Sequence, residues 1–217
     1  MGKVRLRQTM EKLEERDYHD EWHTFIHEGS MHSLSSIYDR HFNFLFDYGR
    51  RFTSDYFLIE DAIQNIFTNL IRSRAQLQDV RNSKNYLVVS FRYELFRLIA
   101  RSRKFNLNKP AHEVLFVADY SAEEAIEKEE SQSQMKNVLL KCLHNLTSKQ
   151  QEILFLRYDA GLSYEEISNT LHISIESCRT SVYRAIKDIK AELEKMNING
   201  HTLFLYLFTK ITGNYLN

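Results

Sequence analysis

Residues 161–185 read GLSYEEISNTLHISIESCRTSVYRA, and this stretch decides what kind of fold the chain contains. Ser163 followed by Glu166 has the spacing of a capping box, which predicts a short helix over residues 163–171. A tight connection at residues 172–174 comes next, and a longer periodic segment predicts a second helix over residues 175–195. Two helices joined by so short a turn indicate a helix-turn-helix, whose second helix enters the DNA major groove.

The residue types on the two faces of this motif support a role in binding duplex DNA. A small core between the helices is expected from Ile167, Leu171, Ile173, Cys178 and Val182. The polar and cationic residues that remain on the outer face suit base edges and phosphates, and they are Glu176, Ser177, Arg179, Thr180, Ser181, Arg184 and Lys187. An ordinary three-helix bundle with a solvated face is the alternative, but core spacing, cap and polar face agree on the DNA-binding interpretation.

Composition favours an all-α fold without a membrane anchor or a disulfide framework. The chain has 217 residues, one proline and six glycines, and so few turn formers argue against sandwiches and barrels. Two cysteines favour a reducing cytoplasm, and the N-terminus lacks the apolar core of a signal peptide. The longest apolar run, residues 203–208, is too short to span a membrane. We therefore expect a cytoplasmic protein that is not an integral membrane protein.

Charge is distributed unevenly, although the formal net charge is zero. Residues 72–109 contain ten lysines and arginines against two acids, and residues 113–130 contain seven acids against one lysine. A basic block followed by an acidic block indicates two functional surfaces instead of a uniform field. Together with the helical periodicity on either side of the acidic block, we expect two small helical domains joined by an acidic linker. The expected limits are residues 18–106 for the first domain, 107–132 for the linker, 133–196 for the second domain and 197–217 for a C-terminal tail.

Amphipathic patterning in the first domain predicts helices over residues 20–27, 33–52, 55–71 and 84–103, with a loop between the last two. Three segments then carry a resemblance: FTSD at 52–55, IEDAIQNIFTNL at 59–70 and NSKNYL at 82–87. They resemble region 2 of bacterial RNA polymerase sigma factors. Residues 146–193, beginning LTSKQQEI, resemble region 4. The order and the short linker resemble the extracytoplasmic-function class, and the likeness covers roughly residues 21–195.

The resemblance implies a non-enzymatic subunit that directs RNA polymerase to promoters and helps to melt them. Its partners would be the β′ and β subunits of core polymerase, promoter DNA and an anti-sigma factor. The helix face implied to bind core polymerase carries Asp61, Gln64, Asn65 and Thr68. The melted strand needs cations for its backbone and polar or aromatic groups for its bases. The residues expected to bind it are Gln76, Asn82, Lys84, Asn85, Tyr86, Arg97, Arg101 and Lys104. Tyr93 is a second candidate for base stacking.

Two positions depart from the family pattern. Ile71 stands where the family usually has tryptophan, and we expect it still to pack; Asn65 stands where an acid is frequent, which removes one expected charge contact. A polymerase-independent helix-turn-helix regulator is therefore the alternative function, and an inert interaction module is a third.

Other site chemistry is not indicated by the sequence. His19, His23 and His27 recur every four residues, but no fourth ligand is evident, so we expect a solvated face and no metal site. We find no phosphate-binding glycine loop, nucleophile elbow or paired-carboxylate site, so no catalytic residue and no cofactor is expected.

Overall fold

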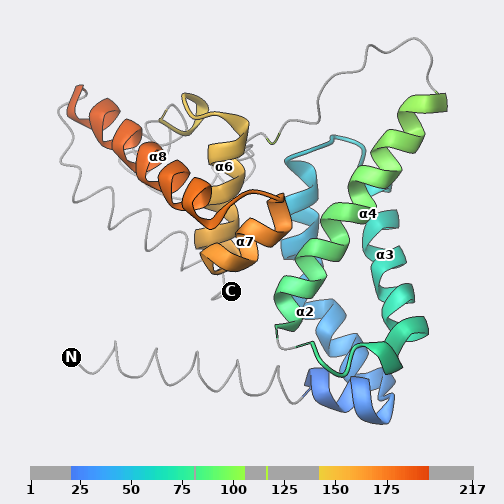
Figure 1. Ribbon diagram of the computed structural model, residues 1–217. Helices are drawn as coiled ribbons and strands as arrows, with labels where there is room; N and C mark the ends of the chain where they lie inside the picture. The colour runs from blue at the N-terminus through green and yellow to red at the C-terminus, as the bar shows by residue number, and fades with distance from the viewer. Residues whose placement is uncertain (1–20, 81, 106–115, 117–141, 196–217) are drawn as a thin grey trace, which may run out of the picture. The chain divides into compact units, whose positions relative to one another are not determined.

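The computed structural model describes residues 21–80, 82–105, 116 and 142–195, and these residues contain helices and turns but no strand (Figure 1). They fall into two compact units, one within residues 1–112 and the other within residues 113–217. The predicted all-α fold class is confirmed. Three predicted features lie outside the described residues: the tail, His19 and all of the linker except Phe116. The limits of the predicted domains stay predictions.

The first unit is built from a helix at residues 21–28 and three longer helices (Figure 1). These are α2 (Met31–Arg50), α3 (Tyr56–Ser73) and α4 (Ser83–Phe105). A single 3-10 turn, η1 (Arg74–Gln76), follows α3 and replaces the first part of the predicted loop. The four predicted helices are confirmed, and each of their ends lies within two residues of its predicted position.

Polar side chains begin each of the three long helices. The Ser33 backbone N–H donates to Ser30 Oγ at 3.2 Å at the start of α2. Asp55 accepts from the Leu58 N–H at 3.4 Å at the start of α3. Asn82 does the same for α4, since its Oδ1 accepts the Asn85 N–H at 2.9 Å. Each bond satisfies a backbone N–H group that has no partner within its own helix.

The core of the first unit lies where α3 packs against α2 and α4. Side chains with no exposed surface come from all three helices, among them Ile37, Leu45, Tyr48, Ile59, Ile63, Leu70, Leu87, Phe91 and Leu95. Gly49 lets the helices approach closely, because a Cβ there would lie 2.7 Å from Ile59 Cγ2 and 3.0 Å from Phe91 Cζ. This tight packing fixes the surfaces of α3 and α4 relative to each other.

The second unit contains α6 (Ser148–Leu154), a π-helical turn η3 (Phe155–Asp159), α7 (Tyr164–Leu171) and α8 (Ile175–Lys195) (Figure 1). Residues 148–159 are therefore α-helical in their first part and π-helical in their last five residues. The helices predicted over residues 163–171 and 175–195 are confirmed. Both α6 and α7 pack against α8, so α8 is the central element of this unit.

Buried apolar side chains hold α6, α7 and α8 together. Ile153, Leu156, Ile167, Cys178 and Ala185 are completely buried. Of the five residues predicted for the core between α7 and α8, Ile167, Cys178 and Val182 are buried, and Leu171 and Ile173 are half-buried. The apolar stripe of α8 thus faces inward, which turns its polar side chains to the surface.

Candidate nucleic-acid interface

The turn between α7 and α8 is set by hydrogen bonds of its own residues. Ser163 and Glu166 form the predicted capping box: the Glu166 N–H donates to Ser163 Oγ at 3.2 Å, and the Ser163 N–H donates to Glu166 Oε2 at 2.7 Å. His172 then ends α7 in the left-handed region, with φ of 52°. The Ser177 N–H donates to Ser174 Oγ at 3.1 Å, so Ser174 caps α8. These hydrogen bonds fix where α7 begins and ends and where α8 begins.

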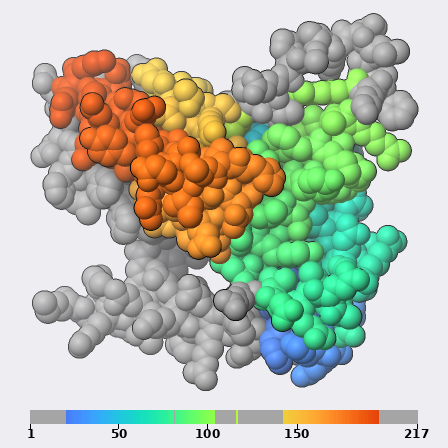
Figure 2. Space-filling model, viewed as in Figure 1, coloured from blue at the N-terminus to red at the C-terminus, as the bar shows by residue number. Residues whose placement is uncertain are grey.

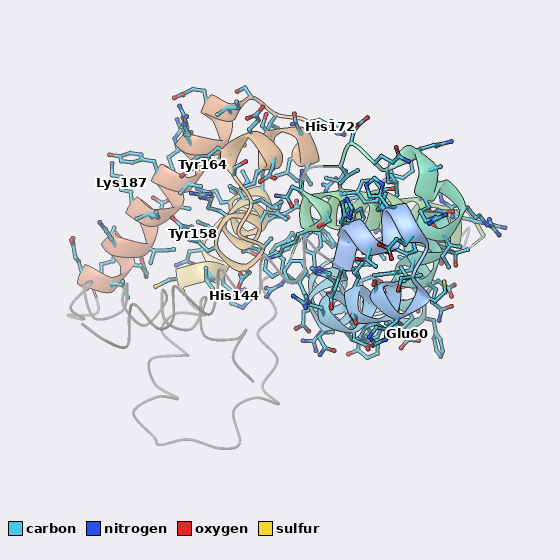
Figure 3. The ribbon with its side chains drawn as sticks, turned by 90° about the horizontal axis from the view of Figure 1, so that it is seen from below. Glu60, His144, Tyr158, Tyr164, His172 and Lys187 are labelled. Carbon is cyan, nitrogen blue, oxygen red and sulfur yellow. The ribbon has the colours of Figure 1, made fainter. Side chains whose placement is uncertain are left out.

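The structure places the predicted duplex-binding residues together on the outward side of α8. Five of them are exposed and two are half-buried; the exposed ones are Glu176, Ser177, Arg179, Arg184 and Lys187, and the half-buried ones are Thr180 and Ser181. Figure 2 shows that α7 and the first turns of α8, both orange, form one continuous surface, and Figure 3 labels Tyr164, His172 and Lys187 within this unit. A capped helix with an exposed cationic face is the element that a major groove accepts.

Sequence reasoning missed three residues beside this surface. Tyr183 is 69% exposed and lies one turn before Lys187, but aromatic residues were not considered for the outer face. Tyr164 has two guanidinium groups over its ring: Arg157 Cζ lies 4.8 Å and Arg179 Cζ lies 5.8 Å from the ring centroid. Helical periodicity could have predicted that Tyr183 is exposed. No local sequence signal predicts the contacts of residues 157 and 179 with the ring of residue 164, because the three residues belong to different elements.

The residues expected to hold a melted strand do not form one cluster. Asn82, Lys84, Asn85 and Tyr86 lie at the start of α4, whereas Arg97 and Arg101 lie in its second half. Twelve residues of α-helix separate Asn85 from Arg97, which is about 18 Å at the usual rise. Gln76 is exposed on η1, and the side chain of Lys104 lies outside the described part.

Several of these side chains already have partners within the protein. Asn82 caps α4, and Lys84 Nζ lies 5.4 Å from the centre of the Phe44 ring. Tyr86, a predicted stacking residue, is half-buried and packs against Trp22 with ring centroids 6.0 Å apart. Tyr93, by contrast, is 73% exposed. Tyr93 is therefore better placed than Tyr86 to receive an unstacked base.

Asn65, Glu94 and Arg97 form a hydrogen-bonded group between α3 and α4. Asn65 Nδ2 donates to Glu94 Oε1 at 2.8 Å. Arg97 donates to both Glu94 oxygens, from Nε at 2.7 Å and from Nη2 at 2.6 Å. The Arg97 hydrogen bonds, and to a smaller extent the bond from Asn65, hold the pKa of the buried Glu94 carboxyl below its ordinary value. The Asn65 amide therefore faces α4, and its expected contact with polymerase stays a prediction.

The remaining predicted polymerase-binding residues share an exposed face of α3. Asp61, Gln64 and Thr68 are all exposed and are spaced three and four residues apart. Ile71 continues this face and is 48% exposed, so the expectation that it packs into the fold is wrong. An apolar residue at the end of a polar face is consistent with a protein contact there.

Comparison with known proteins bears on both units. The family model described as Sigma-70, region 4 matches residues 136–189, which include α6, α7 and most of α8. The ferric citrate uptake sigma factor FecI of Escherichia coli (strain K12) is 26% identical over 155 residues, which make up 71% of this chain and 87% of FecI. The second unit therefore matches region 4 of the sigma-70 type, and the chain as a whole is similar to a sigma factor.

Two solved structures have a fold similar to that of this chain. The sigma factor RpoE from Bartonella quintana, solved in complex with the anti-sigma factor NepR, matches with a TM-score of 0.52 and 18% identity over 74% of this chain and 96% of that chain. CnrH, solved in complex with the cytosolic domain of CnrY, matches with a TM-score of 0.50 and 14% identity over 80% and 96% of the two chains. At these identities the matches show that the chain shares their fold.

The described residues contain neither a membrane-spanning helix nor a metal site. None of the helices in these residues combines the length and the apolar character that a membrane crossing needs. His23 and His27 stack with ring centroids 4.1 Å apart, but no third ligand joins them in the described part of the chain.

Proposed function

We propose that this chain is a sigma factor of the extracytoplasmic-function class. It directs RNA polymerase to promoters by inserting the start of α8 into the major groove, and α4 assists promoter melting. The exposed polar and cationic face of α8 carries this proposal. The capping box of α7 and the Ser174 cap fix that helix before DNA arrives, so little order has to be gained on binding. Sigma factors are non-enzymatic, and we assign no reaction of its own to the chain.

Within α8 we assign different roles to the outward residues. Arg179 is the candidate for bidentate base contacts, since arginine pairs with guanine O6 and N7. Ser177 and Thr180 suit phosphates or base edges, and Arg184 and Lys187 lie further along the helix, where they suit the DNA backbone. On α4, we propose the exposed Arg101 and the exposed ring of Tyr93 as contacts of the separated strand.

We propose that Asp61, Gln64, Thr68 and Ile71 on α3 form the contact with core polymerase. The support is a contiguous exposed face whose apolar end has no place in the core. A partner of the anti-sigma type is also proposed, because RpoE and CnrH, which share this fold, were solved in complexes named for NepR and CnrY. We further propose that the protein acts in the cytoplasm, where core polymerase and DNA are found.

The test is transcription in vitro with purified core polymerase and fragmented genomic DNA from the source organism. We expect discrete transcripts that require the protein and that weaken with Arg179→Ala and with Arg101→Ala. Lys195→Ala is the matched control, because Lys195 is an exposed cation at the far end of α8 that pairs with Glu192 at 2.9 Å.

Two further measurements separate the steps of this function. Binding to core polymerase should survive both arginine substitutions and should weaken with Thr68→Arg. Duplex binding without any polymerase-dependent transcript would refute the proposal and favour a polymerase-independent regulator.

A further inference from the structure

We propose that Tyr164 positions the guanidinium group of Arg179 for its contact with DNA; this inference rests on the proposed function of α8. Tyr164 is the first residue of α7, and Arg179 lies in the second turn of α8. The two residues are fifteen positions apart in sequence, yet Arg179 Cζ lies over the Tyr164 ring, 5.8 Å from its centroid. This distance is within the range in which a ring face attracts a cation.

The Tyr164 ring is itself held in place from two sides. Its backbone follows the Ser163 cap, which fixes where α7 begins. Arg157 Cζ lies 4.8 Å from the same ring, and Arg157 Nη1 donates to the Leu162 carbonyl oxygen at 2.7 Å. Arg157 is thus anchored to the backbone that leads into α7, and the half-buried ring has a defined position before Arg179 reaches it.

The contact with Tyr164 matters for Arg179 because the Arg179 side chain is exposed and otherwise free to change rotamer. An exposed arginine samples many rotamers, and this freedom is lost when the guanidinium binds a base edge or a phosphate. A contact with a fixed ring reduces the number of rotamers in the unbound protein, so less freedom is lost on binding. The ring therefore acts through Arg179 and needs no contact with DNA itself.

The size of the effect follows from the exposed location. A cation–π contact at an exposed site corresponds to about a 2- to 5-fold change in an equilibrium constant. We therefore expect Tyr164→Leu to weaken binding of the polymerase holoenzyme to its promoter duplex by that factor. Tyr164→Phe keeps the ring and should bind like the wild type.

A double-mutant cycle separates positioning from a general structural role. The promoter duplex is the one selected by transcription of genomic fragments, and the holoenzyme contains the full-length chain. We expect Tyr164→Leu to weaken binding in the wild-type background and to have no further effect when Arg179→Ala is present. The Tyr164→Leu holoenzyme should also discriminate less against promoters with a single-base change at the position that Arg179 reads. Thermal unfolding of each variant shows whether the fold is retained.

A measurement on the protein without DNA tests the contact directly. The ring current of Tyr164 should shift the side-chain NMR signals of Arg179, and Tyr164→Leu should remove this shift while Tyr164→Phe retains it. Absence of the shift in the wild type, or equal losses of binding from Tyr164→Leu in both backgrounds, would overturn the positioning role alone. Loss with Tyr164→Phe as large as with Tyr164→Leu would assign the effect to the hydroxyl and overturn it too. A wild-type holoenzyme that binds no promoter duplex would refute the proposed function, and the positioning role with it.

Discussion

Replacing Asn65 by aspartate should destabilise the first unit in a strongly pH-dependent way. The Asn65 amide donates to Glu94 Oε1 at 2.8 Å, and Glu94 is buried. Asn65→Asp removes a hydrogen bond to a charged group, worth about 1.5–3 kcal/mol, and sets two carboxylates against each other. An acid at this position, frequent in the family, thus conflicts with this chain's own Glu94.

The magnitude has an upper limit, because one carboxyl can take up a proton instead of remaining charged. With an unfolded pKa of about 3.9 for the introduced carboxyl, protonation costs about 4 kcal/mol at pH 7 and about 1.5 kcal/mol at pH 5. The folded-state pKa of that carboxyl is raised above its unfolded value. Its destabilising effect is therefore absent below about pH 4 and grows as pH rises toward the folded-state pKa.

Urea unfolding at pH 7 and pH 5 measures this effect. Trp22 is the single tryptophan of the chain and is buried in the first unit, so its fluorescence reports that unit. Asn69→Asp, the same chemical change one turn along α3 at an exposed site, is the control and should cost little at either pH. Equal losses for Asn65→Asp at both pH values, or a loss no larger than that of Asn69→Asp, would refute the reasoning.

Four other results are expected. His172→Gly should raise the free energy of unfolding by up to about 1 kcal/mol in thermal melts, because glycine adopts the positive φ at this turn without a Cβ clash; a loss would contradict this. Gly49→Ala should lower the free energy of unfolding by about 1–3 kcal/mol, since its Cβ would overlap a side chain of α3. Asn82→Ala should lower the free energy of unfolding by about 1 kcal/mol because the α4 cap is lost, whereas Asn82→Ser should keep the cap. If Asn82→Ser preserves stability but abolishes promoter opening, the Asn82 amide contacts DNA. Cys142 and Cys178 should react slowly with iodoacetamide at pH 8, because burial raises the pKa of both thiols, and urea should accelerate the reaction.

The sequence predicted most where local chemistry and periodicity act together. The capping box at Ser163 and Glu166 and the apolar stripe of α8 identified the helix-turn-helix, and both are present in the structure. The same periodicity predicted which side of α8 is exposed. These signals lie within a few residues of each other in the chain, so they need no knowledge of the tertiary fold.

Interactions between elements could not be predicted in this way. Asn65 lies on the same helix face as Asp61 and Thr68 by spacing, but its partner is 29 residues away on α4. Tyr86 was predicted to stack on a base, but its ring packs against Trp22 of the first helix. Ile71 was expected to pack because isoleucine is apolar, yet no neighbouring element covers it completely, and it is 48% exposed. Tertiary neighbours decide such cases.

The ion pair between Arg97 and Glu94 has a consequence for how ionic strength affects strand binding. A cationic side chain that reaches a phosphate normally releases a condensed counterion, which steepens the decline of log K with log salt by about 0.7 per phosphate on single strands. Arg97 must leave one anion to reach another, so it contributes little to this release. If Arg97 holds the separated strand, as the sequence predicts, Glu94→Gln should steepen the salt dependence of strand binding by about one phosphate. The native ion pair would then make strand binding less sensitive to changes in cellular salt.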